Sequence, residues 1–162
     1  MATPKFIKSI QPSLLDRLVD LEPDTRAEVP VSRAESLRQF RLGVKRDLEW
    51  LLNTTCAPLD IPEPCLEAKN SLLCYGLPDI SSVTLQDPGD EQKVLRSLEE
   101  AIERFEPRLA HARVTSKEPY KTGTQAIVFH IEAVLMVDPA PERISFDTVL
   151  EISKGAYSVK EG

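Results

Sequence analysis

Hydrophobic residues recur with a helical period in the first two-thirds of the chain and with a strand period in the last third. The spacing predicts a long amphipathic helix over residues 32–53, which Asn53-Thr54-Thr55 ends, and a second over residues 91–106. In each helix the apolar residues recur at steps of three and four along one face. These residues are Leu37, Phe40, Val44, Leu48 and Leu51 in the first helix, and Val94, Leu95, Leu98, Ile102 and Phe105 in the second.

After Pro107 the hydrophobic period becomes two, which is typical of half-buried strands. The alternation predicts strands over residues 109–116, 125–137, 146–152 and 157–160, with a turn at Lys154-Gly155 before the last. Helices followed by consecutive strands indicate an α+β fold. We therefore expect two main helices packed on a small sheet, either antiparallel or mixed, that the C-terminal half mainly forms.

The chain of 162 residues has the length of one domain. Residues 1–31 are predicted to form an N-terminal extension with a short helix, in which Ser13 caps a turn carrying Leu14 and Leu18. Residues 32–162 are predicted to form a single α+β domain. Its middle part is rich in turns, and an apolar run from Ser71 to Tyr75 stops at Gly76-Leu77-Pro78.

The net charge and the number of cysteines make some classes of protein less favoured. A net charge of -6 disfavours general binding to nucleic acid, because the surface repels phosphate. An odd number of cysteines disfavours a disulfide framework and favours a reducing compartment. The N-terminus has no apolar signal-peptide core, and the longest apolar stretch, residues 126–137, is too short to cross a bilayer. A cytoplasmic location is predicted.

No cofactor or metal is predicted. The glycines are too scattered for a phosphate-binding loop, and His111 and His130 are not at metal-ligand spacing. The three cysteines, Cys56, Cys65 and Cys74, lie at a spacing that matches no common zinc module. We expect them to be ordinary thiols.

The tripeptide Glu106-Pro107-Arg108 is the candidate site. Proline stiffens the backbone and ends the preceding helix, so an acid and a base lie at a fixed corner. Three interpretations remain open. The corner is a helix end with Arg108 in a local salt bridge, a docking site for a partner, or the general acid of a glycoside hydrolase. The last needs a second carboxylate about 5–10 Å away, and aromatic residues for sugar stacking are scarce at 6%.

Four segments in this order resemble the family of the type VI secretion baseplate subunit TssE and the related wedge protein of contractile phage tails. They are Ser13-Leu14-Leu15-Asp16-Arg17-Leu18, Arg46-Asp47-Leu48-Glu49-Trp50-Leu51-Leu52-Asn53-Thr54, Tyr75-Gly76-Leu77-Pro78-Asp79 and Phe105-Glu106-Pro107-Arg108-Leu109. The resemblance implies a non-enzymatic structural subunit, despite the family's old lysozyme-like label. Such subunits bind the wedge subunits TssF and TssG on the cytoplasmic face of a membrane-anchored machine. They also help to start polymerisation of the sheath subunits TssB and TssC.

The resemblance also implies which residues bind partners, and we expect Glu106, Pro107 and Arg108 to form the docking site. A second interaction site is predicted from the strand pattern. The C-terminal hairpin from Phe146 to Lys160, with Val149 and Tyr157, offers a sheet edge to which an incoming sheath strand adds. Two alternative functions stay open, a peptidoglycan hydrolase that uses Glu106 and a small regulatory protein-binding module. The same fold family includes a small anti-adaptor that regulates proteolysis by binding another protein.

Trp50 is the one tryptophan of the chain and lies one position away from the apolar stripe of the first helix. We expect it to be a partly buried residue at the flank of the core. The alternative is an exposed interface anchor, a role for which tryptophan is favoured.

Overall fold

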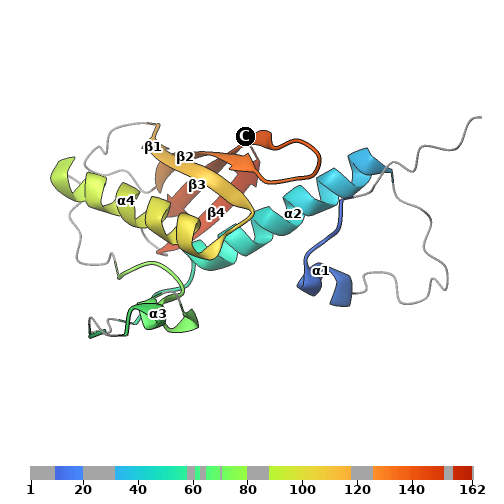
Figure 1. Ribbon diagram of the computed structural model, residues 1–162. Coiled ribbons are helices and arrows are strands. Elements are labelled where there is room, and N and C mark those ends of the chain that lie inside the picture. Colours follow the sequence, from blue (N-terminus) through green and yellow to red (C-terminus); the bar gives the residue numbers. More distant parts are fainter. Residues whose placement is uncertain are drawn as a thin grey trace, which may run out of the picture. The chain divides into compact units, whose positions relative to one another are not determined.

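A computed structural model describes residues 10–19, 32–57, 61–62, 65–69, 71–79, 88–117, 126–151 and 155–161 (Figure 1). It separates the chain into two compact units, Met1–Lys45 and Arg46–Gly162. The boundary lies within helix α2 (Arg33–Leu52), and each unit is described by itself below. The predicted division at residue 31 stays a prediction.

In the first unit, Ser13 caps the short helix α1 (Leu14–Leu18), as predicted. The Ser13 side chain accepts a hydrogen bond from the Asp16 backbone N–H at 3.2 Å and donates one to the Asp16 carboxylate at 2.6 Å. That carboxylate in turn lies against Gly43 of α2, where an added Cβ would be only 2.9 Å from Asp16 Oδ2. The glycine within α2 therefore makes room for this close approach.

The helices of the second unit follow the predicted order with shifted bounds. Helix α4 (Pro88–Phe105) begins three residues earlier than predicted, since proline is well tolerated in the first turn of a helix. The apolar run after Ser71 forms the 3-10 helix η2 (Leu72–Cys74), and a further short helix, α3 (Leu66–Lys69), was not predicted.

Gly76 makes the tight turn after η2. Its φ is +111°, and an added Cβ would lie 2.3 Å from the Thr54 carbonyl oxygen, so only glycine fits there. The turn sets the backbone of Leu77 beside the segment that follows α2. Leu77 N–H donates to Thr54 O at 2.8 Å, and Cys56 N–H donates to Leu77 O at 2.7 Å.

The C-terminal half forms a four-stranded sheet in the order β1-β2-β3-β4, with every neighbouring pair antiparallel (Figure 1). The strands are β1 (Leu109–Ser116), β2 (Ala126–Leu135), β3 (Glu142–Glu151) and β4 (Ala156–Glu161). Strand β3 begins four residues earlier than predicted. The predicted α+β class is confirmed, and the sheet is purely antiparallel.

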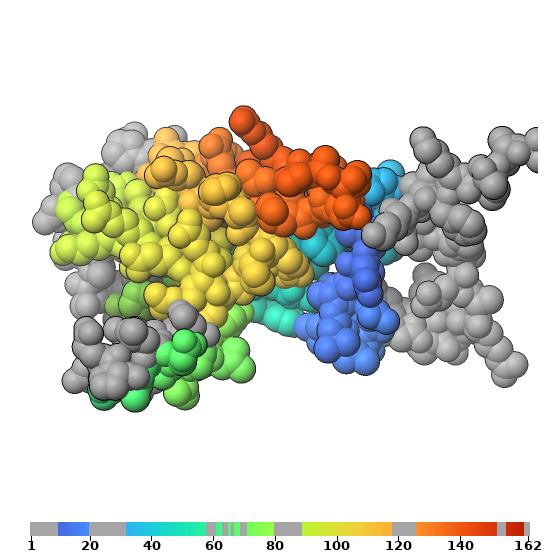
Figure 2. Space-filling view, in the orientation of Figure 1, coloured from blue at the N-terminus to red at the C-terminus, as the bar shows by residue number. Residues whose placement is uncertain are grey.

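One face of the sheet is buried, as the period of two predicted. The buried sheet residues are Leu109, Ala112, Val114, Ile127, Phe129, Ile131, Ala133, Leu135, Ile144, Phe146, Thr148, Leu150, Tyr157 and Val159. In α4, Val94, Leu98 and Ile102 are also buried, while Leu95 and Phe105 of the predicted stripe are half-buried. Helix α4 packs on β1, with which it forms one continuous surface in Figure 2. None of the described helices is long and apolar enough to cross a membrane.

Candidate functional site

The corner at Glu106-Pro107-Arg108 joins helix α4 to strand β1. The helix ends at Phe105, although Glu106 N–H still donates to Ile102 O at 2.9 Å. Pro107 is exposed in the turn, and β1 begins at Leu109, whose N–H donates to Glu106 O at 3.0 Å. The helix therefore stops where the proline predicted.

Glu106 and Arg108 bind each other across this turn. The guanidinium of Arg108 contacts both carboxylate oxygens of Glu106, with Nε at 2.6 Å from Oε1 and Nη2 bonded to Oε2. The Glu106 side chain is only 4% exposed and that of Arg108 is 19% exposed. Such a bidentate geometry is among the stronger side-chain pairings.

Asp47 of α2 completes the arrangement. Its Oδ2 lies 2.7 Å from Arg108 Nη2, and its Oδ1 accepts from Arg46 Nε at 2.8 Å and from Nη2 at 2.6 Å. Burial alone lowers the pKa of Arg108, but hydrogen bonds and charges from Glu106 and then Asp47 outweigh it and raise that pKa. We call these four residues (Arg46, Asp47, Glu106 and Arg108) the Asp47 cluster.

The cluster continues to the surface through Trp50. The Arg46 guanidinium lies 5.0 Å from the centre of the Trp50 ring, which is cation–π geometry. Trp50 is 53% exposed, so the expectation of a partly buried flank of the core is not what the structure shows. The ring lies on the outside of α2, in contact with Arg46.

The geometry of the corner bears on each of the three interpretations of the tripeptide. The helix end and the local ion pair are both present. Arg108 engages both oxygens of Glu106, and the carboxyl is buried, which is a poor arrangement for a residue that must donate a proton to a bound sugar. The parts of the corner that reach solvent are Pro107, the edge of Arg108 and the adjoining Trp50.

The two predicted residues of the C-terminal hairpin lie in different environments. Val149 is half-buried on the outer face of β3, paired with Val128 and Ser158. Tyr157 is 5% exposed, its ring belongs to the core, and burial raises its pKa to about 12. Only the backbone of Tyr157 is therefore placed to meet another group at the edge of the sheet.

That backbone already has a partner, which sequence reasoning missed. Tyr157 N–H donates to Asn53 Oδ1 at 2.8 Å, and Asn53 Nδ2 donates to Tyr157 O at 2.8 Å. The sequence identified Asn53 only as a residue that ends a helix. A contact between residues 104 positions apart has no signal in a single sequence.

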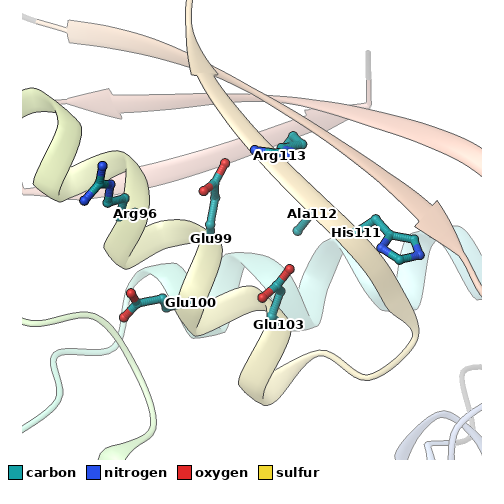
Figure 3. Close-up of a pocket in the computed structure, with 7 residues that line it drawn as sticks. All are labelled: Arg96, Glu99, Glu100, Glu103, His111, Ala112 and Arg113. Carbon is teal, nitrogen blue, oxygen red and sulfur yellow. The ribbon is translucent and has the colours of Figure 1, made fainter.

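A cavity of about 320 Å³ lies between α4 and β1 (Figure 3). Its charged lining is mixed, with Arg96, Glu99, Glu100 and Glu103 on α4 and His111 and Arg113 on β1. Glu99 has a structural contact, because its carboxylate accepts from the Val114 N–H at 2.8 Å. This bond satisfies a backbone donor on the outer edge of β1.

Polar side chains also gather on the outer face of the sheet. The Asp147 carboxylate lies 2.7 Å from both Lys117 Nζ and His130 Nδ1, and hydrogen bonds from Lys117 and then His130 lower its pKa. Among the described residues, no group of three or more His, Cys, Asp or Glu side chains is arranged to hold a metal ion. The cysteines are free thiols.

Comparison with known proteins gives matches of three kinds. The family model described as "Baseplate wedge protein gp25" matches residues 38–140, which is well over half of the chain. The Anti-adapter protein IraD of Salmonella arizonae is 31% identical over 120 residues, covering 72% of this chain and 88% of that protein. A solved chain from "The baseplate complex from the type VI secretion system" has a TM-score of 0.49 and 23% identity, covering 69% of this chain and 94% of that one.

The family match contains three of the four segments on which the resemblance rests, including the whole Asp47 cluster. The segment at Ser13 and strands β3 and β4 lie outside it. The resemblance predicted from the sequence to baseplate wedge proteins is thus confirmed. The chain belongs to the family of baseplate wedge protein gp25.

Proposed function

We propose that this protein is a structural subunit of the baseplate wedge of a type VI contractile injection machine. In this role it works in the cytoplasm and binds the wedge subunits TssF and TssG. The observation that carries the proposal, beside family membership, is the Asp47 cluster. It fixes an exposed corner, Arg46, Trp50, Pro107 and Arg108, which we call the docking corner.

Rigidity suits this corner for binding. Arg108 is held by Glu106 and Asp47, and Arg46 is held by Asp47 and Trp50, so few rotamers remain to be lost on association. Tryptophan and arginine are also the residue types that contribute most to binding energy at interfaces. We infer that Trp50 is the anchor of the docking corner and that the cluster beneath it keeps the anchor in place.

The second part of the proposal concerns the sheath. Of the two edges of the sheet, β1 is covered by α4, where Glu99 accepts the Val114 N–H. In the described part of the chain, β4 pairs with β3 on one side and has no strand on the other. An open edge accepts an extended segment by main-chain hydrogen bonding. We propose that the β4 edge takes a strand of a sheath subunit, TssB or TssC, and so helps to start polymerisation.

The test is affinity purification of the tagged full-length protein from its own cells, with bound proteins identified by mass spectrometry. Wild type is compared with Trp50→Ala, with the double variant Glu106→Ala/Arg108→Ala, and with Lys93→Ala. The last is the control, because Lys93 is an exposed residue of α4 whose side chain contacts Asp90. Circular dichroism checks that each variant is folded.

We expect wild type and Lys93→Ala to recover TssF and TssG equally. Trp50→Ala should reduce the recovery about tenfold or more, the usual effect of removing an interface anchor. Equal recovery with both corner variants, when they are folded, would show that docking occurs elsewhere. A purification that yields no baseplate subunit even with wild type would contradict the proposed function itself.

A regulatory role is the second candidate, and the similarity to an anti-adapter protein favours it. In that case the chain would act alone by binding one protein of a proteolysis pathway. The same purification separates the two roles. A regulator would recover an adaptor or protease component with wild type, and no wedge subunit.

A further inference from the structure

The side chain of Asn53 imitates a strand residue at the outer edge of β4. Its amide oxygen accepts from Tyr157 N–H and its amide nitrogen donates to Tyr157 O, both at 2.8 Å. An antiparallel strand makes the same two bonds with a residue of its neighbour. The Asn53 amide is fixed from the other side too, since it also donates to Glu49 O at 2.8 Å.

The two bonds show which backbone groups of β4 point outward. In an antiparallel pair, alternate residues direct their N–H and C=O groups toward the neighbouring strand, and the residues between direct them away. Tyr157 points away from β3, because its N–H reaches Asn53. Val159 has the same orientation, whereas Ser158 and Lys160 bond to β3. Asn53 therefore occupies the first half of the edge, and within the described ranges no strand pairs with the half that begins at Val159.

We infer that Asn53 fixes the register of the strand that adds to β4. This inference rests on the proposed function, in which the β4 edge takes a strand of a sheath subunit. An incoming strand finds its first available pair of bonds at Val159, because Asn53 fills those of Tyr157. Asn53 is thus a positioning residue, and it prevents the strand from sliding toward the start of β4.

The side chains of β4 beside this edge indicate which residues the incoming segment carries. The residue directly opposite Val159 lies on the buried face of the sheet, since Val159 is 2% exposed. The next residue lies on the outer face beside Lys160, which is exposed and is paired with Asp147 of β3 on its other side. The structure therefore fits an extended peptide with an apolar residue next to an acidic one.

Register is measured by photo-crosslinking in the full-length protein in its own cells. The probe is Ser158→p-benzoylphenylalanine, which leaves Lys160 and the Asn53 bonds in place, and mass spectrometry identifies the partner residue that is captured. The probe protein is compared with the same protein carrying Asn53→Ala or Asn53→Asp. Thr54→Val is the matched control, because the Thr54 hydroxyl donates to Trp50 O and, among the described residues, makes no hydrogen bond to β4.

With Asn53 present, we expect cross-links to one sheath residue. With Asn53→Ala they should spread to a position two residues away, because a slip of one residue would turn the apolar residue outward. Asn53→Asp keeps the acceptor and loses the donor, so it tests the same point if the alanine variant does not fold. Lys160→Glu should lower recovery of the sheath subunit at least about threefold, since a like-charge pair replaces an attractive one.

Each of the remaining outcomes of the cross-linking experiment would contradict a different part of the proposal. Unchanged cross-links in both folded Asn53 variants would overturn the register role and leave strand addition intact. Cross-links to a second copy of this chain would show that the edge pairs with itself, which overturns the inference. Absence of any cross-link, while TssF and TssG still co-purify, would overturn strand addition at β4 and the inference with it, but not membership of the baseplate.

Discussion

The guanidinium of Arg108 lies 2.7 Å from the carboxylate of Asp47, and this contact joins residues 61 positions apart. It links the last turns of α2 to the turn between α4 and β1. Through Arg46 the same carboxylate is connected to the exposed Trp50 ring. The buried ion pair is thus connected to the proposed anchor, and variants at opposite ends of the cluster are needed to separate effects on stability from effects on the proposed docking.

Arg108→Ala is expected to lower the free energy of unfolding by about 3 kcal/mol. The reason is that the buried carboxylate of Glu106 loses its partner, and an uncompensated buried charge is strongly destabilising. Asp47→Asn should cost less, about 1 kcal/mol, because Asp47 is more exposed and Glu106 keeps its pairing with Arg108. Urea denaturation followed by circular dichroism measures both.

The control for this prediction is the exposed Asp90–Lys93 pair of α4. Its removal by Lys93→Ala should change stability by less than about 0.5 kcal/mol. Equal effects of Arg108→Ala and Lys93→Ala would mean that the Glu106–Arg108 pair is not stabilising in solution.

Tyr157→Phe is expected to keep or raise stability at neutral pH, by up to about 1 kcal/mol. The buried Tyr157 hydroxyl has no hydrogen-bond partner in the part of the chain that the structure describes, so its removal ends a desolvation penalty while the ring stays in the core. Tyr157→Ala should instead cost about 3–5 kcal/mol, because it leaves a cavity. Thermal unfolding of the three proteins at pH 7 compares them, and a large loss in Tyr157→Phe would reveal a partner for the hydroxyl.

The same residue gives a pH prediction. Burial raises the pKa of Tyr157 in the folded protein to about 12, from 10.0. The pKa of Tyr157 is higher in the folded protein than in the unfolded chain. Its contribution to the free energy of unfolding is therefore complete below pH 10 and is lost between pH 10 and 12, where only the unfolded state ionises. The free energy of unfolding of Tyr157→Phe, relative to that of wild type, should therefore rise by about 2 to 3 kcal/mol over this range. Urea denaturation at pH 9, 10 and 11 measures the difference in stability between the two proteins. A difference that does not change with pH would contradict a raised pKa of Tyr157 as its cause.

The sequence predicted the parts of the fold that periodicity encodes. Leu48 and Leu51 of α2 and Ile127 and Phe129 of β2 are buried as their spacing indicated, because burial of one face leaves a regular pattern along the chain. Element ends were less certain. Strand β3 was predicted to begin at Phe146 but begins at Glu142, because its pairing with β2 continues as far as Leu135.

Long-range contacts were beyond the sequence. The tripeptide predicted an acid and a base at a corner, but not that Asp47 would share Arg108. The Asn53–Tyr157 bonds were missed for the same reason, since asparagine at a helix end has a sufficient local explanation. Periodicity also misplaced Trp50. One position off the stripe is compatible with either partial burial or exposure, and contact with Arg46 on the outer side favours exposure.

Glu99→Ala is expected to uncover the edge of β1. The Glu99 carboxylate accepts the Val114 N–H, so its loss leaves a backbone donor on an edge strand without that partner. Stability should fall by about 1–2 kcal/mol, and self-association should increase. Glu99→Gln, which retains an acceptor, should lie closer to wild type. Hydrogen exchange at Val114 and light scattering measure the two effects, with Glu100→Ala as the control, because Glu100 is an exposed neighbour.

The bulge in β1 yields the last prediction. The register with β2 shifts between Ala110 and Arg113, and His111 within this bulge has a φ of 56°. Residues with a Cβ are strained in this left-handed region, by about 1–2 kcal/mol, although histidine tolerates it better than most. His111→Gly should therefore keep stability within about 1 kcal/mol of wild type or raise it, since relief of strain opposes the greater entropy of the unfolded chain. His111→Val should destabilise by more, because a β-branched side chain is least compatible with positive φ. Urea denaturation of both variants is the measurement, and a valine variant as stable as the glycine variant would mean that the bulge rearranges.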